Sequence, residues 1–373
     1  MRSKSLQADF DLRLDFLTSD PIFPMSESTP AFPVFASDPP QPVWMVRRPR
    51  PRWWLYVLFL LLTMFSTTVV GARMEFNYLH RQPVFSLNDD SISLFPIAWA
   101  FEKPSNLLLG LPFSLTLMFI LFAHEMGHYL YARYYRVYAT PPFFVPFPSL
   151  IGTLGAFIRI KSSIPSRAAL FDIGIAGPIA GFIPACVALL VGLSLSHPAA
   201  GASTPQFQLG FPLAFAIAHR LLGIATPLSA LSLHPVAAAA WVGMFATALN
   251  LLPGGQLDGG HILHSISPRL HWWSTLLTVL ALVPLGKYLW TGWFLWAVLL
   301  AITGKHPPVP PYPKVVGRRV GIAICGLLIL ILSFTPAPFT HSSGKEVWPD
   351  IRDGARETFH DLRDGIRHKL HRR

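Results

Sequence analysis

The sequence has little charge for its length. Only 13% of its 373 residues are Asp, Glu, Lys or Arg, whereas 52% are apolar. A soluble globular domain carries about 25% charged residues, so this chain has too little polar surface to cover a water-exposed fold. The composition therefore excludes an ordinary soluble protein and a wholly disordered one, and it indicates a protein that lives in a lipid bilayer.

Cysteine is scarce as well. Cys186 and Cys325 both lie inside apolar runs, which excludes a disulfide framework and a cysteine metal cluster. The net charge of +11 is compatible with nucleic-acid binding, but cytoplasmic loops of membrane proteins collect Lys and Arg for topological reasons. We therefore expect the lipid bilayer, and no nucleic acid, among the partners.

The apolar stretches predict an all-α polytopic membrane protein with about 6–7 transmembrane helices. Residues 1–52, with nine prolines between positions 21 and 51, are expected to be a disordered cytoplasmic tail. The transmembrane domain is expected over 53–335, with its catalytic core at about 107–265. Four arginines directly before the first span place that side of the membrane in the cytoplasm: Arg47, Arg48, Arg50 and Arg52. Residues 342–373 show apolar steps of three and four, which predict an amphipathic helix that lies on the membrane, pairs with a partner or docks on its own protein.

One segment within this domain is not expected to span the membrane. Residues 137–166 contain five prolines, and GTLGAFIRI at 152–160 alternates enough to indicate a short strand. Irregular backbone at membrane depth is tolerated only where protein or a wet cavity covers it. We therefore predict a short re-entrant β-hairpin beside an active site, and at 152–155 a plain tight turn is the alternative interpretation.

Acidic residues are rarest where the chain is most apolar. Between residues 107 and 304 there are three of them: Glu125, Asp172 and Asp258. An acid at the centre of a membrane helix costs roughly 2.5–3.5 kcal/mol on the insertion scale, so its presence calls for a reason. For Asp172, near the start of a span, the simplest reason is the dipole at a helix N-terminus.

The first of these acids belongs to an H-E-x-x-H pattern, His124-Glu125-Met126-Gly127-His128. Residues four apart share a helical face, so both imidazoles can face one metal ion while Glu125 reaches a water at that ion. A structural histidine pair in a polar interior is the alternative.

A second motif supplies the missing ligand. Asp258 lies in LDGGH (257–261), preceded by Asn250, and a catalytic zinc site needs three protein ligands and one open position. Counting spans and arginines places both motifs at the same depth near the cytoplasmic side. Asp258 is therefore the predicted third ligand, with a turn aspartate as the alternative, and His261 and His264 are weaker candidates.

With these motifs the sequence resembles the site-2 protease family of intramembrane zinc metalloproteases, peptidase family M50, in its bacterial and plant-plastid branch. HEMGH (124–128) and NLLPGGQLDGGH (250–261) carry the resemblance, with GTLGAFIRI, Asp172 and GPIAG (177–181) in the expected order and GKHPPVP (304–310) after them. The resemblance implies a three-helix catalytic core with Zn²⁺ and peptide-bond hydrolysis in the membrane. It also implies roles for named positions, with His124, His128 and Asp258 as metal ligands, Glu125 and Asn250 as catalytic residues, and Gly152, Thr153 and Gly155 in a substrate-binding strand.

The expected function is therefore cleavage of a transmembrane protein substrate within or near its membrane span. The expected location is a bacterial inner membrane, with the active site toward the cytoplasm. A metal-binding transporter or scaffold without protease activity is the main alternative, but it should show acids along several spans or inverted repeats. A prenyl-protein peptidase is a further alternative. Such an enzyme uses another glutamate-bearing helix, and no second glutamate occurs in the core of this chain. For GPIAG, the small-xxx-small spacing favours close helix packing.

Overall fold

The computed structural model describes residues 52–85, 97, 103–200 and 209–339. The predicted amphipathic helix at 342–373, and all but the last residue of the predicted tail at 1–52, lie outside the described residues.

Helices dominate the described part of the chain. They are α2 (Trp53–Leu79), α4 (Pro104–Leu109), α5 (Leu111–Tyr134), α6 (Arg167–Leu195), α7 (Leu213–Leu221), α8 (Pro235–Asn250), α9 (Asp258–Ile266), α10 (Pro268–Tyr288), α11 (Gly292–Ile302) and α12 (Arg318–Ser333). The strands are β1 (Phe143–Pro146), β2 (Thr153–Phe157), β3 (His197–Pro198) and β4 (Leu231–Ser232), and a short 3₁₀ helix covers Leu228–Ala230.

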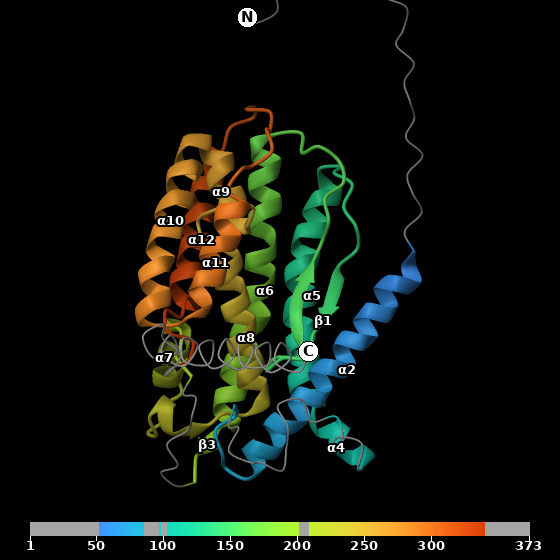
Figure 1. Ribbon diagram of the computed structural model, residues 1–373, viewed down its shortest axis with the longest axis vertical. Coiled ribbons are helices and arrows are strands. Elements are labelled where there is room, and N and C mark those ends of the chain that lie inside the picture. Colours follow the sequence, from blue (N-terminus) through green and yellow to red (C-terminus); the bar gives the residue numbers. More distant parts are fainter. Residues whose placement is uncertain (1–51, 86–96, 98–102, 201–208, 340–373) are drawn as a thin grey trace, which may run out of the picture. The chain divides into compact units, whose positions relative to one another are not determined.

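The helices α5, α6, α8, α10 and α12 run roughly alongside one another, and α2 lies obliquely to them (Figure 1). The C-terminal end of α5 and the N-terminal ends of α6 and α12 lie at the same end of the bundle (Figure 1). That end carries the exposed basic residues Arg133, Arg136, Arg159 and Lys161, which is the arrangement expected for the cytoplasmic side of a membrane.

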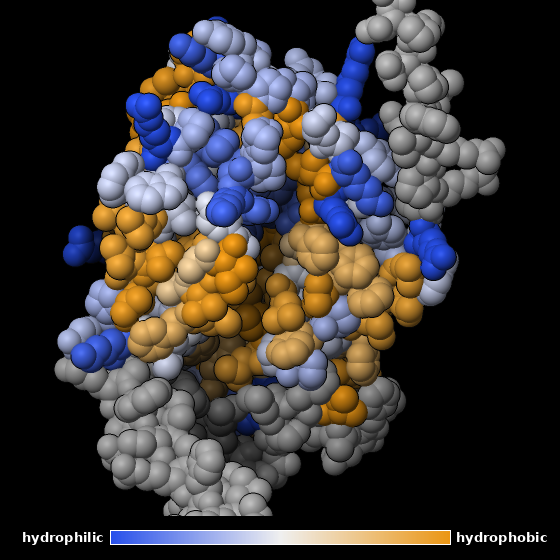
Figure 2. Space-filling model, turned by 45° about the horizontal axis from the view of Figure 1, so that its top comes forward, coloured by the Kyte–Doolittle hydropathy of each residue, from blue (hydrophilic) through white to orange (hydrophobic). Residues whose placement is uncertain are grey.

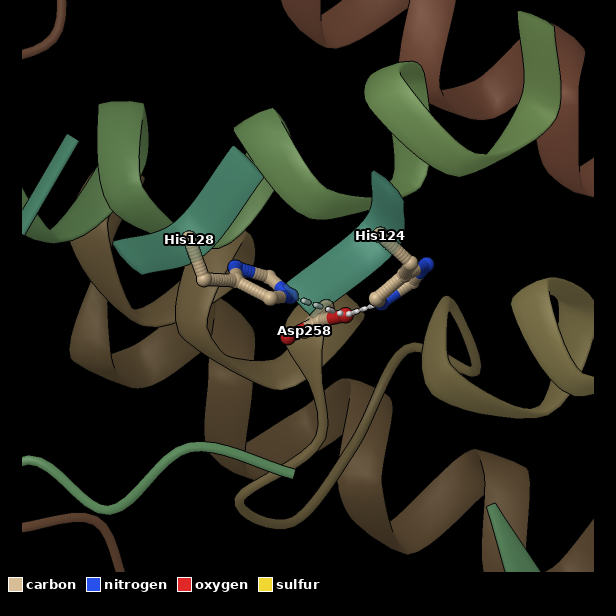
Figure 3. Close-up of side chains that lie close together, drawn as sticks. All are labelled: His124, His128 and Asp258. Atoms are coloured by element: carbon tan, nitrogen blue, oxygen red, sulfur yellow. Dashed lines mark hydrogen bonds and ion pairs between the residues drawn. The ribbon is translucent and has the colours of Figure 1, made fainter. Parts of the chain in front are cut away.

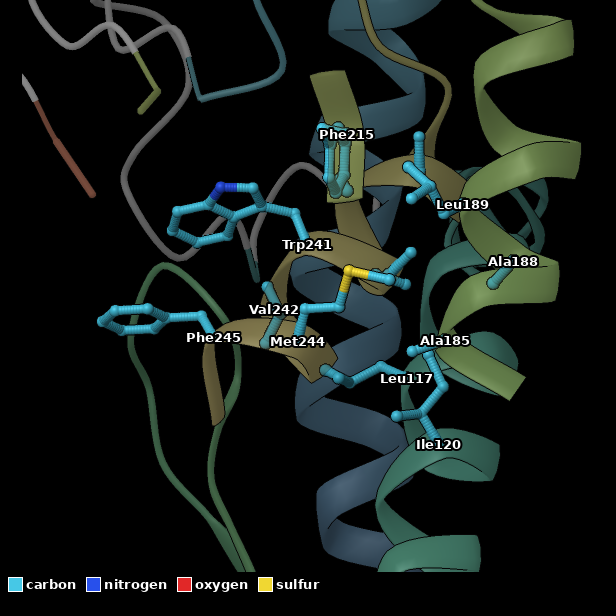
Figure 4. Packing of buried hydrophobic residues seen from close by; sticks show 14 of the residues in the cluster. Leu117, Ile120, Ala185, Ala188, Leu189, Phe215, Trp241, Val242, Met244 and Phe245 are labelled. Carbon is cyan, nitrogen blue, oxygen red and sulfur yellow. The ribbon is translucent and has the colours of Figure 1, made fainter. Parts of the chain in front are cut away.

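The predicted three-helix core is formed by α5, α6 and α8, which pack against one another. An apolar cluster lies between them (Figure 4), with Leu117 and Ile120 from α5, Leu189 from α6, and Trp241 and Met244 from α8 all buried. Gly243 of α8 lets the Ile120 side chain approach so closely that an added Cβ would lie 2.6 Å from it. This tight packing fixes the relative heights of α5 and α8, and hence of the motifs at their ends.

The outer surface of the bundle is apolar in a band. Figure 2 shows polar side chains gathered at one end of the face in view and apolar side chains below them. Within the described residues, α2 and α6 are each long and apolar enough to cross a membrane alone, and α8 and α11 are apolar but shorter. The 24-residue α5 has the length to cross but carries the polar HEMGH turn. The total of six to seven spans stays a prediction.

The β-hairpin predicted within 137–166 is present. β1 and β2 pair antiparallel, with Phe143 opposite Phe157 and Phe144 opposite Ala156. β1 packs on α2, where the Phe143 and Phe59 rings lie 4.7 Å apart and the Ser66 hydroxyl donates to the Gly152 carbonyl at 2.6 Å. The hairpin is thus attached to α2 on one side, and β2 lies toward α5 (Figure 1).

Two helices begin or end where the sequence pattern did not place them. The first apolar span continues through polar residues to Leu79, where the buried Asn77 side chain donates to the Val84 carbonyl at 3.0 Å. The second begins as α4 and is interrupted at Gly110, where an added Cβ would lie 1.8 Å from the Thr68 carbonyl oxygen. Contact with α2 therefore accounts for the interruption at Gly110.

Candidate metal centre and active-site cavity

The two histidines of HEMGH lie on one face of α5. His124 and His128 are 5% and 7% exposed, and their ring centroids are 5.0 Å apart. Spacing of one helical turn brings both imidazoles to the same side, as the sequence predicted.

Asp258 reaches the histidines from another part of the chain. It is the first residue of α9, which follows a short turn after α8. Its Oδ2 lies 3.2 Å from Nε2 of His124 and 3.3 Å from Nε2 of His128 (Figure 3). The structure therefore brings together all three predicted ligands, and in the described part of the chain this is the group of His, Cys, Asp and Glu side chains that could hold a metal ion.

The donor set fits zinc. One nitrogen of each histidine and one carboxylate oxygen lie within 4.8 Å of one another. Tetrahedral coordination with bonds of 2.0–2.1 Å puts neighbouring ligand atoms about 3.3 Å apart, which agrees with the two distances to Asp258. His128 Nδ1 lies 2.7 Å from the Ile173 carbonyl oxygen and must donate to it, so Nε2 keeps the lone pair that a metal needs.

The GPIAG motif makes room for these histidines. An added Cβ at Gly177 would lie 2.0 Å from Nε2 of His128, and one at Gly181 would lie 2.9 Å from Cβ of His124. The two glycines are four residues apart, like the two histidines, and face them in antiparallel order. Close packing was predicted for GPIAG, but its connection with the metal ligands was missed; the matching i, i+4 spacing is the signal that could have revealed it.

Glu125 and Asn250 lie beside the metal centre. Glu125 is 6% exposed and lies close to Ile158 in the lining of one cavity. Asn250, the last residue of α8, has Nδ2 3.4 Å from Nε2 of His124. Both line a cavity of about 210 Å³ together with His128 and Asp258. A carboxylate and an amide thus meet the metal ligands at one small cavity.

β2 forms part of the wall of this cavity. Ala156, Phe157 and Ile158 line it, whereas the predicted substrate-binding residues Gly152, Thr153 and Gly155 lie at the start of the strand, outside the lining. Thr153 is occupied within the hairpin, since its hydroxyl donates to the Val145 carbonyl at 2.8 Å and accepts from the Gly155 amide at 2.9 Å. Gly152, Thr153 and Gly155 therefore shape the hairpin, whereas the residues that follow them, Ala156 to Ile158, reach the cavity.

Asp172, the third acid of the apolar region, pairs with an arginine, whereas the sequence suggested only an interaction with the dipole of a helix N-terminus. Asp172 lies in the second turn of α6 and binds Arg319 of α12 through two contacts, at 2.7 and 2.9 Å. The Tyr135 hydroxyl also donates to it. Asp172 thus joins the ends of α5, α6 and α12, a role that is invisible in the sequence because Arg319 lies 147 residues away.

Comparison with known proteins agrees with the residues at this site. The profile of peptidase family M50 matches residues 112–272, which include both motifs. The chain is 31% identical over 306 residues to a protein of Oryza sativa subsp. japonica named as a probable chloroplastic zinc metalloprotease, EGY1, covering 76% of this chain and 51% of that protein. It is 34% identical over 256 residues to the Arabidopsis thaliana protein named probable zinc metalloprotease EGY2, chloroplastic. That match covers 66% of this chain and 45% of that protein.

A second Arabidopsis thaliana protein, named probable zinc metalloprotease EGY1, chloroplastic, is 31% identical over 302 residues, covering 76% of this chain and 53% of that protein. The chain spans about half the length of the curated relatives it matches. The matched residues carry the two histidines, the glutamate and the aspartate that the fold assembles. The chain therefore belongs to peptidase family M50.

Proposed function

We propose that this protein is an intramembrane zinc metalloprotease that hydrolyses a peptide bond within or near a transmembrane segment of a membrane-protein substrate. The observation that carries the proposal is the meeting of His124, His128 and Asp258, from two separate helices, beside a cavity that Glu125 lines together with His128 and Asp258. Two imidazoles, a carboxylate ligand and a free carboxylate are the groups that metal-assisted hydrolysis requires.

The proposed ligands are His124, His128 and Asp258. A zinc ion held by these three residues would supply a Lewis acid that makes a bound water more acidic and polarises the scissile carbonyl. Glu125 accepts a proton from the attacking water and then delivers it to the nitrogen of the leaving amine. Asn250 donates from Nδ2 toward the developing oxyanion. The Ile173 carbonyl holds the His128 ring in the tautomer that leaves Nε2 unprotonated.

A helical substrate must unwind before cleavage, because its peptide bonds are hidden in the hydrogen bonds of the helix. In the described part of the chain β2 pairs only with β1, so no strand occupies its second edge, to which we propose that the substrate adds. Ile158, directly after β2, lines the same cavity as Glu125. A substrate added to β2 would therefore run past the catalytic carboxylate in extended form.

The proposed setting is a lipid bilayer, with the cavity near the basic end of the bundle. The plant relatives are named as chloroplastic proteins. For this chain we propose a bacterial inner membrane, with the cavity toward the cytoplasm, from where water reaches the site. Fractionation of the expressing cell tests this location, and recovery from the soluble fraction would contradict it.

The direct test compares Glu125→Gln with the unaltered protein in bilayer vesicles. The probe, called here the test peptide, is a quenched-fluorescent peptide with about 20 apolar residues, enough to span a bilayer, and a central Asn-Gly-Pro that weakens its helix. We expect cleavage to fall by about 10²–10⁴-fold, the usual contribution of a general base, while one zinc per chain stays bound. Undiminished cleavage by Glu125→Gln would refute the role of Glu125.

The same variant can identify the natural substrate. Glu125→Gln keeps the cavity and the proposed metal ligands but removes the base, so it should retain uncleaved substrate. Affinity purification followed by mass spectrometry should then recover a membrane protein whose span is cleaved by the unaltered enzyme. Captured proteins that are never cleaved would contradict the proposed substrate class.

A further inference from the structure

A second pair of histidines lies at the wall of the catalytic cavity. His261, on α9 one turn after Asp258, lines the cavity. Its Nδ1 is 2.8 Å from Nε2 of His306, which belongs to the segment 303–317 between α11 and α12. The mechanism proposed above uses neither residue.

The direction of this hydrogen bond follows from its neighbours. Nδ1 of His306 lies 2.7 Å from the Pro307 carbonyl oxygen, which can only accept, so this nitrogen carries the proton. Burial lowers the pKa of His306 below its ordinary value, so the ring is neutral at pH 7 and its Nε2 is an acceptor. His261 must therefore donate from Nδ1, and its own Nε2 is left unprotonated.

His306 and the 303–317 segment around it are held in this position by contacts with other parts of the chain. The His264 ring stacks on it with centroids 3.9 Å apart and planes 14° from parallel, and His271 meets it edge-on at 5.8 Å. The backbone on either side is attached too, because Lys305 accepts from the Gln256 side chain at 3.0 Å and Pro310 accepts from the Arg167 amide at 3.1 Å. The orientation of His261 is thus set by a part of the chain 45 residues away.

The unprotonated nitrogen of His261 has no hydrogen-bond partner among the described residues, and it is not sealed within the protein. Because His261 lines the cavity and its Nδ1 is bound to His306, Nε2 is the ring nitrogen left to meet whatever the cavity holds. The cavity already offers a donor in Asn250 and a carboxylate in Glu125, so His261 adds a neutral acceptor on the wall formed by α9.

We propose that Nε2 of His261 accepts a hydrogen bond from a backbone N–H of the bound substrate next to the scissile bond, and that His306 is the positioning residue that fixes the proton of His261 on Nδ1. This proposal rests on the proposed function. An extended chain presents its N–H and C=O groups alternately at its two edges. A substrate that pairs with β2 by one edge presents N–H groups at the other, where a neutral acceptor suits them.

The first test measures KM and kcat of single variants on the test peptide in vesicles. Loss of one hydrogen bond made equally in the ground and transition states raises KM about tenfold and leaves kcat within about threefold. We expect this of His261→Ala, with zinc content unchanged. His261→Gln restores an acceptor near the position of Nε2, so its KM should return most of the way to the value of the unaltered protein.

His306 is tested in the same way. His306→Ala removes the acceptor for His261 and should raise KM in the same direction, whereas His306→Gln supplies an amide oxygen in its place and should recover it. The matched control is His264→Phe, which keeps the aromatic stack on His306 and leaves the hydrogen bond intact, so KM should not change. KM could instead rise equally in His306→Ala and His264→Phe, and stay raised in His306→Gln. His306 would then only anchor the 303–317 segment, and its assigned role would be overturned.

A second measurement needs no cleavage. ¹⁵N NMR of histidine-labelled protein in bilayers, with His261→Gln to assign the signals, should show the His261 proton on Nδ1, and His306→Ala should release this preference. A proton on Nε2 in the unaltered protein would overturn the proposal. Cleavage by the unaltered protein but not by Glu125→Gln tests the proposed function separately, so a normal KM in His261→Ala alongside that result refutes only the role of His261.

Discussion

Gly177→Ala is the sharpest test of how the fold builds the metal centre. The added Cβ would lie 2.0 Å from Nε2 of His128, whereas ordinary contacts of a Cβ begin near 3.4 Å. His128 cannot simply turn away, because its ring is buried and its Nδ1 is bound to the Ile173 carbonyl of the same helix, α6. The methyl group must therefore separate α5 from α6 or displace Nε2.

The size of the effect follows from the overlap. The shortfall between 2.0 and 3.4 Å is about 1.4 Å, while metal–ligand distances in working sites vary by about 0.2 Å. We therefore expect zinc affinity to fall by at least 10–100-fold, the range found when groups that orient a ligand are lost. Overpacking should also lower the free energy of unfolding by about 1–3 kcal/mol. Gly181→Ala, with its 2.9 Å approach to Cβ of His124, should have a smaller effect.

Zinc affinity is measured by competition with a chelator, and stability by unfolding in detergent. Gly192→Ala is the matched control, because it creates an equally severe overlap on α6, 2.2 Å from the Ala237 amide nitrogen, with no contact to the histidines. It should lower stability without lowering the zinc affinity of the folded protein. If Gly177→Ala binds zinc as tightly as the unaltered chain, the steric reasoning is refuted.

Further predictions concern the rest of the site. Asp258→Ala removes the third ligand, so bound zinc should fall well below one per chain in elemental analysis, and an unchanged content would rule out this ligand. Arg319→Gln leaves Asp172 without its two-point partner and should lower the free energy of unfolding by about 2 kcal/mol in a detergent titration, with zinc content unchanged. Gly155 has φ +101° and open space around its Cβ, so Gly155→Ala strains only the backbone, by about 1–3 kcal/mol. Cleavage of the test peptide should then decrease while zinc stays bound, and normal cleavage would argue against the β2 edge as the substrate-binding strand.

Several features of the fold could be predicted because they depend on local pattern. The 3.6-residue period places His124 and His128 on one face of α5, and the prolines of 137–166 exclude a membrane helix there. The interruption at Gly110 could not be predicted, because a contact between helices decides it. The same limit applies to Asp172, whose simple local explanation gave way to a partner 147 residues along the chain.

The sequence by itself determined the chemistry. A membrane chain that keeps so few acids in its apolar region, and places two of them in HEMGH and LDGGH, carries the groups of a zinc hydrolase whatever its fold. The tertiary structure decided how these groups are held. It set Asp258 against histidines up to 134 residues away, aligned Gly177 and Gly181 with the two rings, and brought His306 to His261. The physical reason is that periodicity fixes which residues share a face, whereas only the packing of α5, α6 and α8 fixes which faces meet, and at what height.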